Sequence, residues 1–269
     1  MTLNIAHRGA RSLAPENTIA AARKAMALGA DLWETDTAVT RDGKIVLFHD
    51  TRLDRTTDAA AVFPEKPSLD LVDYSWGELQ KLDLGATFIK NDPFGEIRRG
   101  SIPREDLDRL VGEKLPSLEQ ALVFTRDSNW KINIELKELP DKIAGFPLPE
   151  KVLDIIRTVG MPISRVIISS FYHPWLEQVQ AMEPEMEIQA LIGDSESAPL
   201  DWGDYRFRVY NARVSRIDEH QIALAKNLGK KINLWTVNDP HDMVRFIRAG
   251  VDGIITDYPQ RLAALPDRG

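Results

Sequence analysis

Segments in which apolar residues recur with helical spacing alternate with short apolar segments along most of the chain. Residues 18–28, 150–159, 218–228 and 241–249 have the helical spacing, and a glycine directly follows each of them. A short apolar segment begins within a few residues of each glycine. Glycine supplies the left-handed residue at which many helices end. Helices that alternate with nearly continuous apolar strands are typical of a parallel sheet in an α/β fold.

The apolar segments give nine candidate strands. They cover residues 3–7, 32–36, 45–49, 131–137, 166–171, 187–192, 208–214, 232–237 and 253–257. Residues 40–44 join the second candidate to the third and contain Asp42-Gly43, a strong hairpin signal. Because a hairpin leaves no room for a crossover helix, these two strands must be antiparallel. The eight strands that remain predict a TIM (β/α)8 barrel, with one domain over residues 1–269.

Residues 51–114 interrupt this alternation. The segment is rich in Asp, Pro, Arg and Gly, and a helical pattern is visible only near residues 75–82. It is too long for an ordinary connection between a strand and a helix. We therefore interpret it as an insertion on the active-site face, placed after the hairpin of the second strand.

Composition narrows the class of protein. Hydrophobic residues make up 43% of the 269 residues, which is enough for a core and excludes a disordered chain or a fibre. The net charge of −7 argues against general nucleic-acid binding. The absence of cysteine excludes disulfides, thiolate metal sites and cysteine nucleophiles. No apolar run is long enough for a membrane span and no signal peptide is visible, so we expect a cytoplasmic protein without stable membrane insertion.

Polar residues stand where several predicted strands end, which is where a (β/α)8 barrel carries its active site. Glu34 and Asp36 are two residues apart, so they point to the same face of their strand. Glu135 and Lys137 repeat this spacing on another strand. Three carboxylates at one rim repel one another unless a cation lies between them. Oxygen ligands favour a hard cation, so we expect one divalent ion, Mg²⁺ or Ca²⁺, at Glu34, Asp36 and Glu135.

Two histidines are predicted at the same rim. If Asp42-Gly43 forms a two-residue turn, counting outward along the hairpin places Asp36 opposite His49. His7 ends the first strand. Because histidine titrates near neutral pH, His7 and His49 suit a pair of acid and base catalysts. The alternative for each histidine is a metal ligand or a buried hydrogen-bonding residue.

The remaining candidates are substrate contacts. Arg8 and Lys137 place fixed positive charge at the rim, which points to an anionic and phosphorylated substrate. Phe171 and Trp235 end two other strands and can pack against an apolar part of the substrate. Packing within the barrel is an equal alternative for these two aromatic residues.

The chain also carries a series of short motifs in a fixed order. They are His7-Arg8-Gly9, Pro15-Glu16-Asn17-Thr18, Glu34-Thr35-Asp36, Phe48-His49-Asp50, Arg55-Thr56-Thr57, Leu115-Pro116-Ser117-Leu118, Ile134-Glu135-Leu136-Lys137, Ser170-Phe171, Trp235-Thr236-Val237-Asn238 and Gly253-Ile254-Ile255-Thr256-Asp257-Tyr258-Pro259. In these motifs, which span nearly the whole chain, the sequence resembles the glycerophosphodiester phosphodiesterase family, of a bacterial, cytosolic type. Thr35 and Thr37 depart from the usual Leu and Val of the family, but they lie beside the acidic residues and leave them in place.

The resemblance implies a TIM barrel with a segment inserted after the second histidine motif. It implies hydrolysis of a small-molecule glycerophosphodiester to an alcohol and glycerol 3-phosphate with a divalent cation, and so a link between lipid and glycerol metabolism. It also implies roles for single residues. Glu34, Asp36 and Glu135 become metal ligands, His7 and His49 the acid–base pair, and Arg8 and Lys137 the phosphate contacts.

Two other functions stay open at this point. One is an activity like that of lysophospholipase D on lysophospholipids, and the other is a barrel that binds a phosphodiester without turnover. The presence of both His7 and His49 favours turnover, because binding alone needs no proton transfer. The sequence leaves the alcohol head group, the choice between Mg²⁺ and Ca²⁺, a cyclic phosphate intermediate and the oligomeric state undecided.

Overall fold

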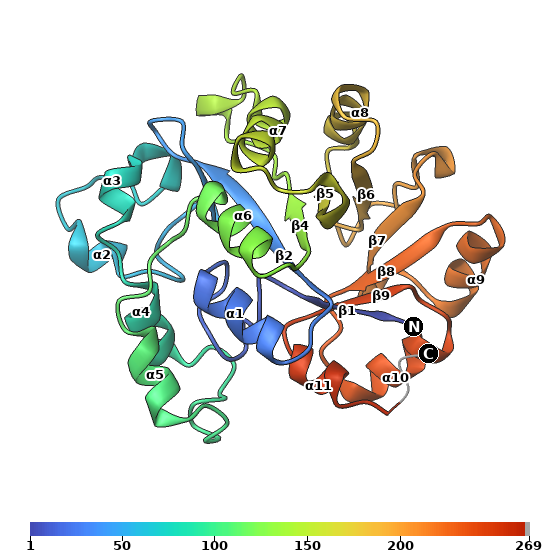
Figure 1. Cartoon of the computed structure of the whole chain (residues 1–269), viewed down its shortest axis with the longest axis horizontal. Coiled ribbons are helices and arrows are strands. Elements are labelled where there is room, and N and C mark those ends of the chain that lie inside the picture. Colours follow the sequence, from blue (N-terminus) through green and yellow to red (C-terminus); the bar gives the residue numbers. More distant parts are fainter. Residues whose placement is uncertain (267–269) are drawn as a thin grey trace.

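A closed barrel of parallel strands forms the centre of the molecule (Figure 1), as a computed structural model of residues 1–266 describes it. Its strands are β1 Leu3–Ala6, β2 Leu32–Val39, β4 Ile132–Glu135, β5 Val166–Ser170, β6 Glu187–Ile192, β7 Val209–Arg213, β8 Lys231–Trp235 and β9 Gly253–Thr256. Each strand pairs in parallel with the next, and pairing of β1 with both β2 and β9 closes the ring. The predicted (β/α)8 barrel is confirmed. Residues 267–269 of the predicted domain lie outside the described residues.

Helices surround the barrel and cover its outer face (Figure 1). They are α1 Ile19–Ala27, α6 Leu118–Asp127, α7 Leu148–Val159, α8 His173–Met182, α9 Glu219–Asn227, α10 Pro240–Arg248 and α11 Pro259–Ala263. Short 3₁₀ helices lie in the connections, at η2 Asp141–Ile143, η3 Ile163–Arg165, η4 Gly203–Tyr205 and η5 Val214–Arg216. As the pattern predicted, α7 ends at Gly160 with a φ of 70°, a left-handed conformation that costs glycine little. Among residues 1–266, no helix is both long and apolar enough to cross a bilayer.

The floor of the barrel lumen is apolar, whereas its upper end is polar. Ile5, Leu32, Ile167 and Ile255 form a cluster of their own, and Ile5 pairs with both Leu32 and Ile255 across the strands. Residues two positions further along the same strands share this face. They are His7, Glu34, Ser169 and Asp257. The polar side chains are thus directed to the carboxyl ends of the strands, above an apolar floor that excludes water from below.

The hairpin forms as predicted, but its register differs by one residue. Strand β3 Ile45–Leu47 is antiparallel to β2, and Ala38 pairs with Val46 where the prediction paired Ala38 with Leu47. The turn has three residues rather than two, because the backbone N–H of Thr40 donates to the carbonyl of Lys44 at 3.0 Å. Gly43 takes a φ of 78° in this turn, as the third residue of such loops commonly does.

The corrected register changes the partner of Asp36. The N–H of Phe48 donates to the carbonyl oxygen of Asp36 at 3.1 Å, so Phe48 rather than His49 lies opposite Asp36. The predicted pairing of Asp36 with His49 is wrong. Strand β3 ends at Leu47, before either residue. Because the chain leaves the ladder there, strand alternation no longer determines where the His49 side chain points.

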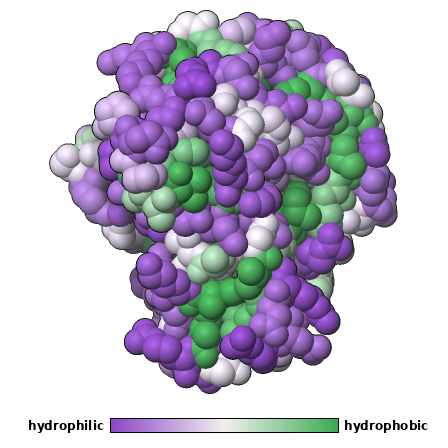
Figure 2. Space-filling model, turned by 90° about the vertical axis from the view of Figure 1, so that its left-hand side faces the viewer, coloured by the Kyte–Doolittle hydropathy of each residue, from purple (hydrophilic) through white to green (hydrophobic). Residues whose placement is uncertain are grey.

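Residues 51–114 pack as a helical unit beside the barrel, next to α1 and α6 (Figure 1). Its elements are α2 Ala59–Val62, η1 Leu71–Asp73, α3 Trp76–Leu79, α4 Leu84–Asn91 and α5 Arg104–Leu110. Only α3 lies in the predicted helical piece, and the longer helices α4 and α5 were not predicted from the sequence. Hydrophilic residues cover most of this flank, with apolar patches between them (Figure 2).

Two apolar clusters attach this unit to the barrel. In one, Phe48 packs with Leu53 and Leu79 beneath the hairpin. In the other, Phe88 and Leu107 pack with residues of α1 and of the loop before it. The unit is therefore held by buried surface at both of its ends, and it keeps a fixed position relative to the residues that follow β1 and β3.

Gly85 tests the packing of this unit. A Cβ at Gly85 in α4 would lie 1.6 Å from the carbonyl oxygen of Leu110 at the end of α5. We expect Gly85→Ala to destabilise the protein by at least ~1–3 kcal/mol, because backbone rather than a flexible side chain must move. Gly77→Ala is the matched control, since a Cβ at this α3 glycine meets nothing within 4 Å. Urea denaturation should show equal or higher stability for the control, and equal stability of both variants would contradict the packing of α4 against α5.

Candidate active site

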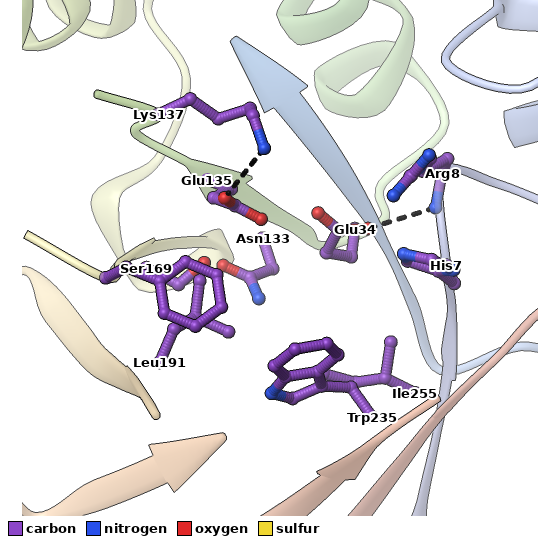
Figure 3. A pocket seen from close by; sticks show the side chains of 11 residues that line it. His7, Arg8, Glu34, Asn133, Glu135, Lys137, Ser169, Leu191, Trp235 and Ile255 are labelled. Carbon is purple, nitrogen blue, oxygen red and sulfur yellow. Dashed lines mark hydrogen bonds and ion pairs between the residues drawn. The ribbon is translucent and has the colours of Figure 1, made fainter. Parts of the chain in front are cut away.

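A cavity opens where the barrel strands end (Figure 3). Seven of the nine predicted site residues line it: His7, Arg8, Glu34, Glu135, Lys137, Phe171 and Trp235. Asn133 and Ser169 line it as well, and Leu191 and Ile255 contribute apolar wall. Asp36 and His49 do not line this cavity, but both lie close to it. The barrel thus brings residues of β2, β4, β5, β6, β8 and β9 and of the segment after β1 to one place.

Three carboxylates meet at the edge of the cavity. Glu34, Asp36 and Glu135 each offer one oxygen, and these oxygens lie within 4.8 Å of one another. The strand register explains the arrangement, because Asp36 pairs with Glu135 across β2 and β4 while Glu34 lies one pleat below Asp36. The Glu34 and Asp36 residues are 5% and 1% exposed, so water screens their repulsion poorly.

Burial and the charges of neighbouring groups shift the pKa values of all three carboxyls. Burial, and then the charges of Asp36 and Glu135, raise the pKa of Glu34 well above its usual value. Burial and the charge of Asp36 raise the pKa of Glu135 to about 7. For Asp36, burial raises the pKa, but the charges of Arg8, His49 and Lys137 outweigh it and leave the pKa below its usual range.

The cluster fits a hard divalent cation. Its donors are all carboxylate oxygens, the ligands that Mg²⁺ and Ca²⁺ prefer. A cation among them would favour the ionised form of Glu34 and Glu135, which burial and mutual repulsion oppose. The raised pKa values of Glu34 and Glu135 therefore agree with a cluster whose ionised form a bound cation would stabilise.

Asn17 fixes the orientation of Asp36. Its Nδ2 donates to Oδ2 of Asp36 at 2.8 Å, and its Oδ1 accepts from the hydroxyl of Thr35 at 2.7 Å. Nε of Arg8 lies 3.1 Å from the same Oδ2 of Asp36. Asn17 adopts a φ of 57°, a left-handed conformation that asparagine tolerates better than most residues. Two groups thus hold one oxygen of Asp36, and its Oδ1 lies on the side of Lys137, whose Nζ is 4.0 Å away.

His7 is held by a carboxylate at the neighbouring strand end. Its Nδ1 lies 2.6 Å from Oδ1 of Asp257, and Asn238 donates to the other Asp257 oxygen at 2.7 Å. Because the ionised Asp257 accepts only, Nδ1 carries the hydrogen and leaves Nε2 as the basic nitrogen. Burial and the charge of Arg8 lower the pKa of His7, although Asp257 opposes the shift. His7 is therefore neutral at neutral pH and able to take a proton.

His49 has a carboxylate partner of the same kind. Its Nδ1 lies 2.6 Å from Oδ1 of Asp50, and Arg55 donates to both oxygens of Asp50 at 2.5 and 3.1 Å. Burial raises the pKa of Asp50, but the bonds from His49 and Arg55 outweigh it and bring the pKa to about 2. The His49 side chain is 33% exposed, more than the 14% of His7. Although the predicted register is wrong, His49 still lies near enough to Asp36 to lower its pKa.

Glu16 connects the two histidine–aspartate pairs. Its side chain is 9% exposed and contacts three guanidinium groups. Arg8 donates to Oε1 at 2.9 Å, Arg11 to Oε2 at 2.5 Å, and Arg55 to both oxygens at 2.6 and 3.0 Å. Arg55 holds the aspartate beside His49, and Nη1 of Arg11 lies 3.4 Å from the aspartate beside His7. One buried carboxylate thus balances the arginines that support both histidines.

Phe171 and Trp235 form one wall of the cavity. Their ring centroids lie 5.6 Å apart at an interplanar angle of 79°, and the indole N–H of Trp235 donates to the carbonyl of Asn211 at 3.0 Å. The two rings therefore pack against each other and also line the cavity, and contact with substrate stays a prediction for both.

Sequence reasoning assigned no role to several residues that shape the site. They are Arg11, Glu16, Asn17, Asp50, Arg55, Asn133, Ser169, Asn238 and Asp257. Asp257 lies at a strand end and Asp50 lies beside His49. These two positions are the signals from which sequence reasoning could have identified both residues. The contacts of Glu16 and Asn17 depend on the fold of a loop, and no spacing rule predicts them.

Comparison with known proteins identifies the family. The profile of the Glycerophosphoryl diester phosphodiesterase family matches residues 7–261. A glycerophosphodiester phosphodiesterase of Caldanaerobacter subterraneus is 35% identical over 100% of this chain and 99% of its own length. A crystal structure of a putative glycerophosphoryl diester phosphodiesterase from Silicibacter pomeroyi is 26% identical, with a TM-score of 0.79 over 97% of this chain and 92% of that one.

A further solved structure shares the fold and contains a ligand. An Oleispira antarctica phosphodiesterase in complex with the product sn-glycerol-3-phosphate is 24% identical, with a TM-score of 0.78 over 97% of this chain and 95% of that one. The family profile, the full-length relative and the arrangement of motifs around one barrel rim agree with the resemblance inferred from the sequence. The chain belongs to the glycerophosphoryl diester phosphodiesterase family of enzymes.

Proposed function

We propose that the protein hydrolyses small glycerophosphodiesters to an alcohol and sn-glycerol 3-phosphate, with one divalent cation, Mg²⁺ or Ca²⁺, at Glu34, Asp36 and Glu135. The observation that carries the proposal is a buried carboxylate cluster with a histidine–aspartate pair on either side. When bound, the cation would neutralise negative charge on the phosphate oxygens. The rest of the chemistry falls to side chains of the chain itself.

Arg8 and Lys137 supply positive charge for the phosphate. Nζ of Lys137 lies 3.5 Å from Oε1 of Glu135, and Arg8 contacts both Glu16 and Asp36. These cations are held in place before substrate binds, so they need little reorganisation as negative charge develops on the phosphate. Only 8% of the surface of Arg8 is exposed, so water screens its charge poorly.

His7 and His49 divide the proton transfers. His7 takes the proton of the nucleophile on Nε2, because its lowered pKa keeps that nitrogen unprotonated and Asp257 orients the ring. As the bond from phosphorus to the leaving oxygen breaks, His49 gives a proton to the leaving alcohol. The nucleophile is water, or the free glycerol hydroxyl next to the phosphate ester. In the second case the cyclic phosphate that forms is opened by water in a second step.

A barrel that only binds a phosphodiester is disfavoured by this geometry. Binding needs the cationic side chains, but it needs neither of the two histidine–aspartate pairs. Release of glycerol 3-phosphate from glycerophosphocholine, assayed with and without EDTA, tests the proposal. We expect release that EDTA abolishes and that added Mg²⁺ or Ca²⁺ restores, and a lack of release from every glycerophosphodiester tested would refute it. Parallel assays on a lysophospholipid test the alternative substrate class.

Asp36→Asn is expected to remove EDTA-sensitive activity and weaken metal binding. The change keeps the size of the side chain but removes one of the charges that attract the cation. Denaturation should show little loss of stability, because the repulsion on Glu34 and Glu135 falls at the same time. Asp127→Asn on α6 is the control, since this side chain is 60% exposed and lies in a surface ion pair. Full activity of Asp36→Asn would remove Asp36 from the metal site.

His7→Ala and His49→Ala should each lower kcat by about 10²–10⁴-fold, the usual contribution of an acid or base catalyst. Metal affinity, measured by calorimetry, should change little in either variant. The double variant should lose far less than the product of the two single losses, because the residues act together.

A nitrophenyl ester separates the two histidine roles. Nitrophenolate leaves without a proton, so this substrate should partly restore the activity of His49→Ala but not that of His7→Ala. Equal restoration in both variants would contradict the division of roles. Loss of metal binding in either variant would make that histidine a ligand instead.

Glu16→Gln is expected to lower kcat by about 10–100-fold, the range seen when groups that support functional residues are changed. The variant keeps the shape of Glu16 but leaves the charges of Arg8, Arg11 and Arg55 without their shared partner. We expect KM to change less than kcat, because Glu16 is a positioning residue without substrate contact. Glu119→Gln, whose side chain is 52% exposed and binds Lys44, should leave both constants unchanged. Wild-type kcat in Glu16→Gln would show that the histidines do not depend on this network.

A further inference from the structure

A second cavity lies on the other side of Lys137 from the first. His49 and Lys137 are among the residues that line it. Its wall is mainly apolar, with contributions from Leu71, Val72 and Leu139. Nothing in the catalytic scheme above uses this cavity.

The two cavities divide the catalytic groups between them. Lys137 lines both, whereas His7 lines only the first and His49 only the second. Lys137 also lies beside the carboxylate cluster, 3.5 Å from Glu135 and 4.0 Å from Asp36. A phosphate held by Lys137 and this cluster therefore lies between the cavities, and its two ester groups extend to opposite sides.

The first cavity has the chemistry of a glycerol site. The Oδ1 atom of Asn133 and the hydroxyl of Ser169 are buried and have no hydrogen-bond partner among the described residues. Both residues line the cavity, and Asn133 lies in its interior in Figure 3. Buried polar atoms are normally satisfied, so these two call for a ligand that carries hydroxyl groups. Leu191 and Ile255 add apolar surface to the wall of the same cavity.

The second cavity has a different character. Apolar side chains make up half of its lining residues and can pack against the carbon skeleton of an alcohol. Asp50 and Glu138 also line it, together with Lys137, so the cavity carries charges of both signs. His49 at this cavity is placed to protonate an alcohol that leaves into it.

We infer that the second cavity binds the leaving alcohol, and that Leu71 and Val72 limit the size of the alcohol that fits, so that choline is accepted more readily than the larger inositol. The inference rests on the proposed function and adds a head-group site to it. It also gives part of the insertion a role in specificity, because Leu71 and Val72 belong to η1 within residues 51–114.

The wall formed by the insertion is well anchored. The N–H of Leu71 donates to the carbonyl of Thr51 at 2.8 Å, and the N–H of Arg41 in the hairpin turn donates to the carbonyl of Tyr74 at 2.9 Å. Tyr74 itself is fully buried. Backbone bonds thus hold η1 against both the hairpin and the segment that follows His49, so the shape of the cavity is set before substrate arrives.

Opposite changes at Val72 test the inference. Val72→Phe should narrow the cavity, and Val72→Ala should widen it. The substrates are glycerophosphocholine and the methyl ester of glycerol 3-phosphate, which differ only in the leaving alcohol. We expect Val72→Phe to lower kcat/KM for glycerophosphocholine by about tenfold or more, because steric changes in apolar pockets have effects of this size. The kcat/KM for the methyl ester should change by less than about twofold. Val72→Ala should raise kcat/KM for the larger glycerophosphoinositol relative to glycerophosphocholine.

The controls separate selectivity from folding. Activity on the methyl ester reports whether each variant folds, and if Val72→Phe does not fold, Val72→Ala carries the test alone. Val111→Phe, also in the insertion and 61% exposed, should leave all three substrates unaffected. Equal effects of the Val72 variants on all substrates, or none on any, would overturn the head-group site alone. A wild-type protein that hydrolyses none of the three would overturn the proposed function and the head-group site with it.

Discussion

Repulsion among three carboxylates, two buried and one largely so, is the constraint around which the rim of the barrel is arranged. Strand register places Glu34, Asp36 and Glu135 within a few ångströms of one another, and their burial denies them the screening of water. A cation can relieve this repulsion, and Arg8 and Lys137 relieve part of it without one. The same positive charges are then available to a phosphate group.

The arginines in turn need their own counter-charge. Arg8 and Arg11 are both largely buried, and a buried cation is costly unless it is paired. Glu16 meets this need for both of them and for Arg55 as well. Its contacts tie the loop after β1 to the segment after β3. Charge balance therefore extends outward from the metal cluster to the groups that orient the two histidines, so catalytic geometry and local folding depend on the same set of ion pairs.

The insertion has a place in this arrangement. It begins directly after the His49 segment, packs under the hairpin through Phe48 and Leu79, and carries η1 to the edge of the site. His49 is half-buried, and Arg55 of the insertion holds its partner Asp50. Attachment of a helical unit with its own apolar clusters gives this side of the site a firm wall, and it does so without altering the strands that carry the carboxylates.

Local patterns in the sequence determined the strands, the helix ends and the polar residues at the strand ends, because periodicity, glycine caps and two-residue alternation are properties of neighbouring residues. They were sufficient for the barrel and for the convergence of Glu34, Asp36 and Glu135. They were insufficient for the hairpin register, where a three-residue turn with Gly43 at positive φ and a two-residue turn have nearly the same sequence signal. The contacts of Glu16, Asn17 and Asp257 were decided only by the tertiary structure, because each joins segments that are distant in the chain or lie in irregular loops. The cavity between Lys137, His49 and η1 has the same origin, since its walls come from segments that only the folded chain brings together.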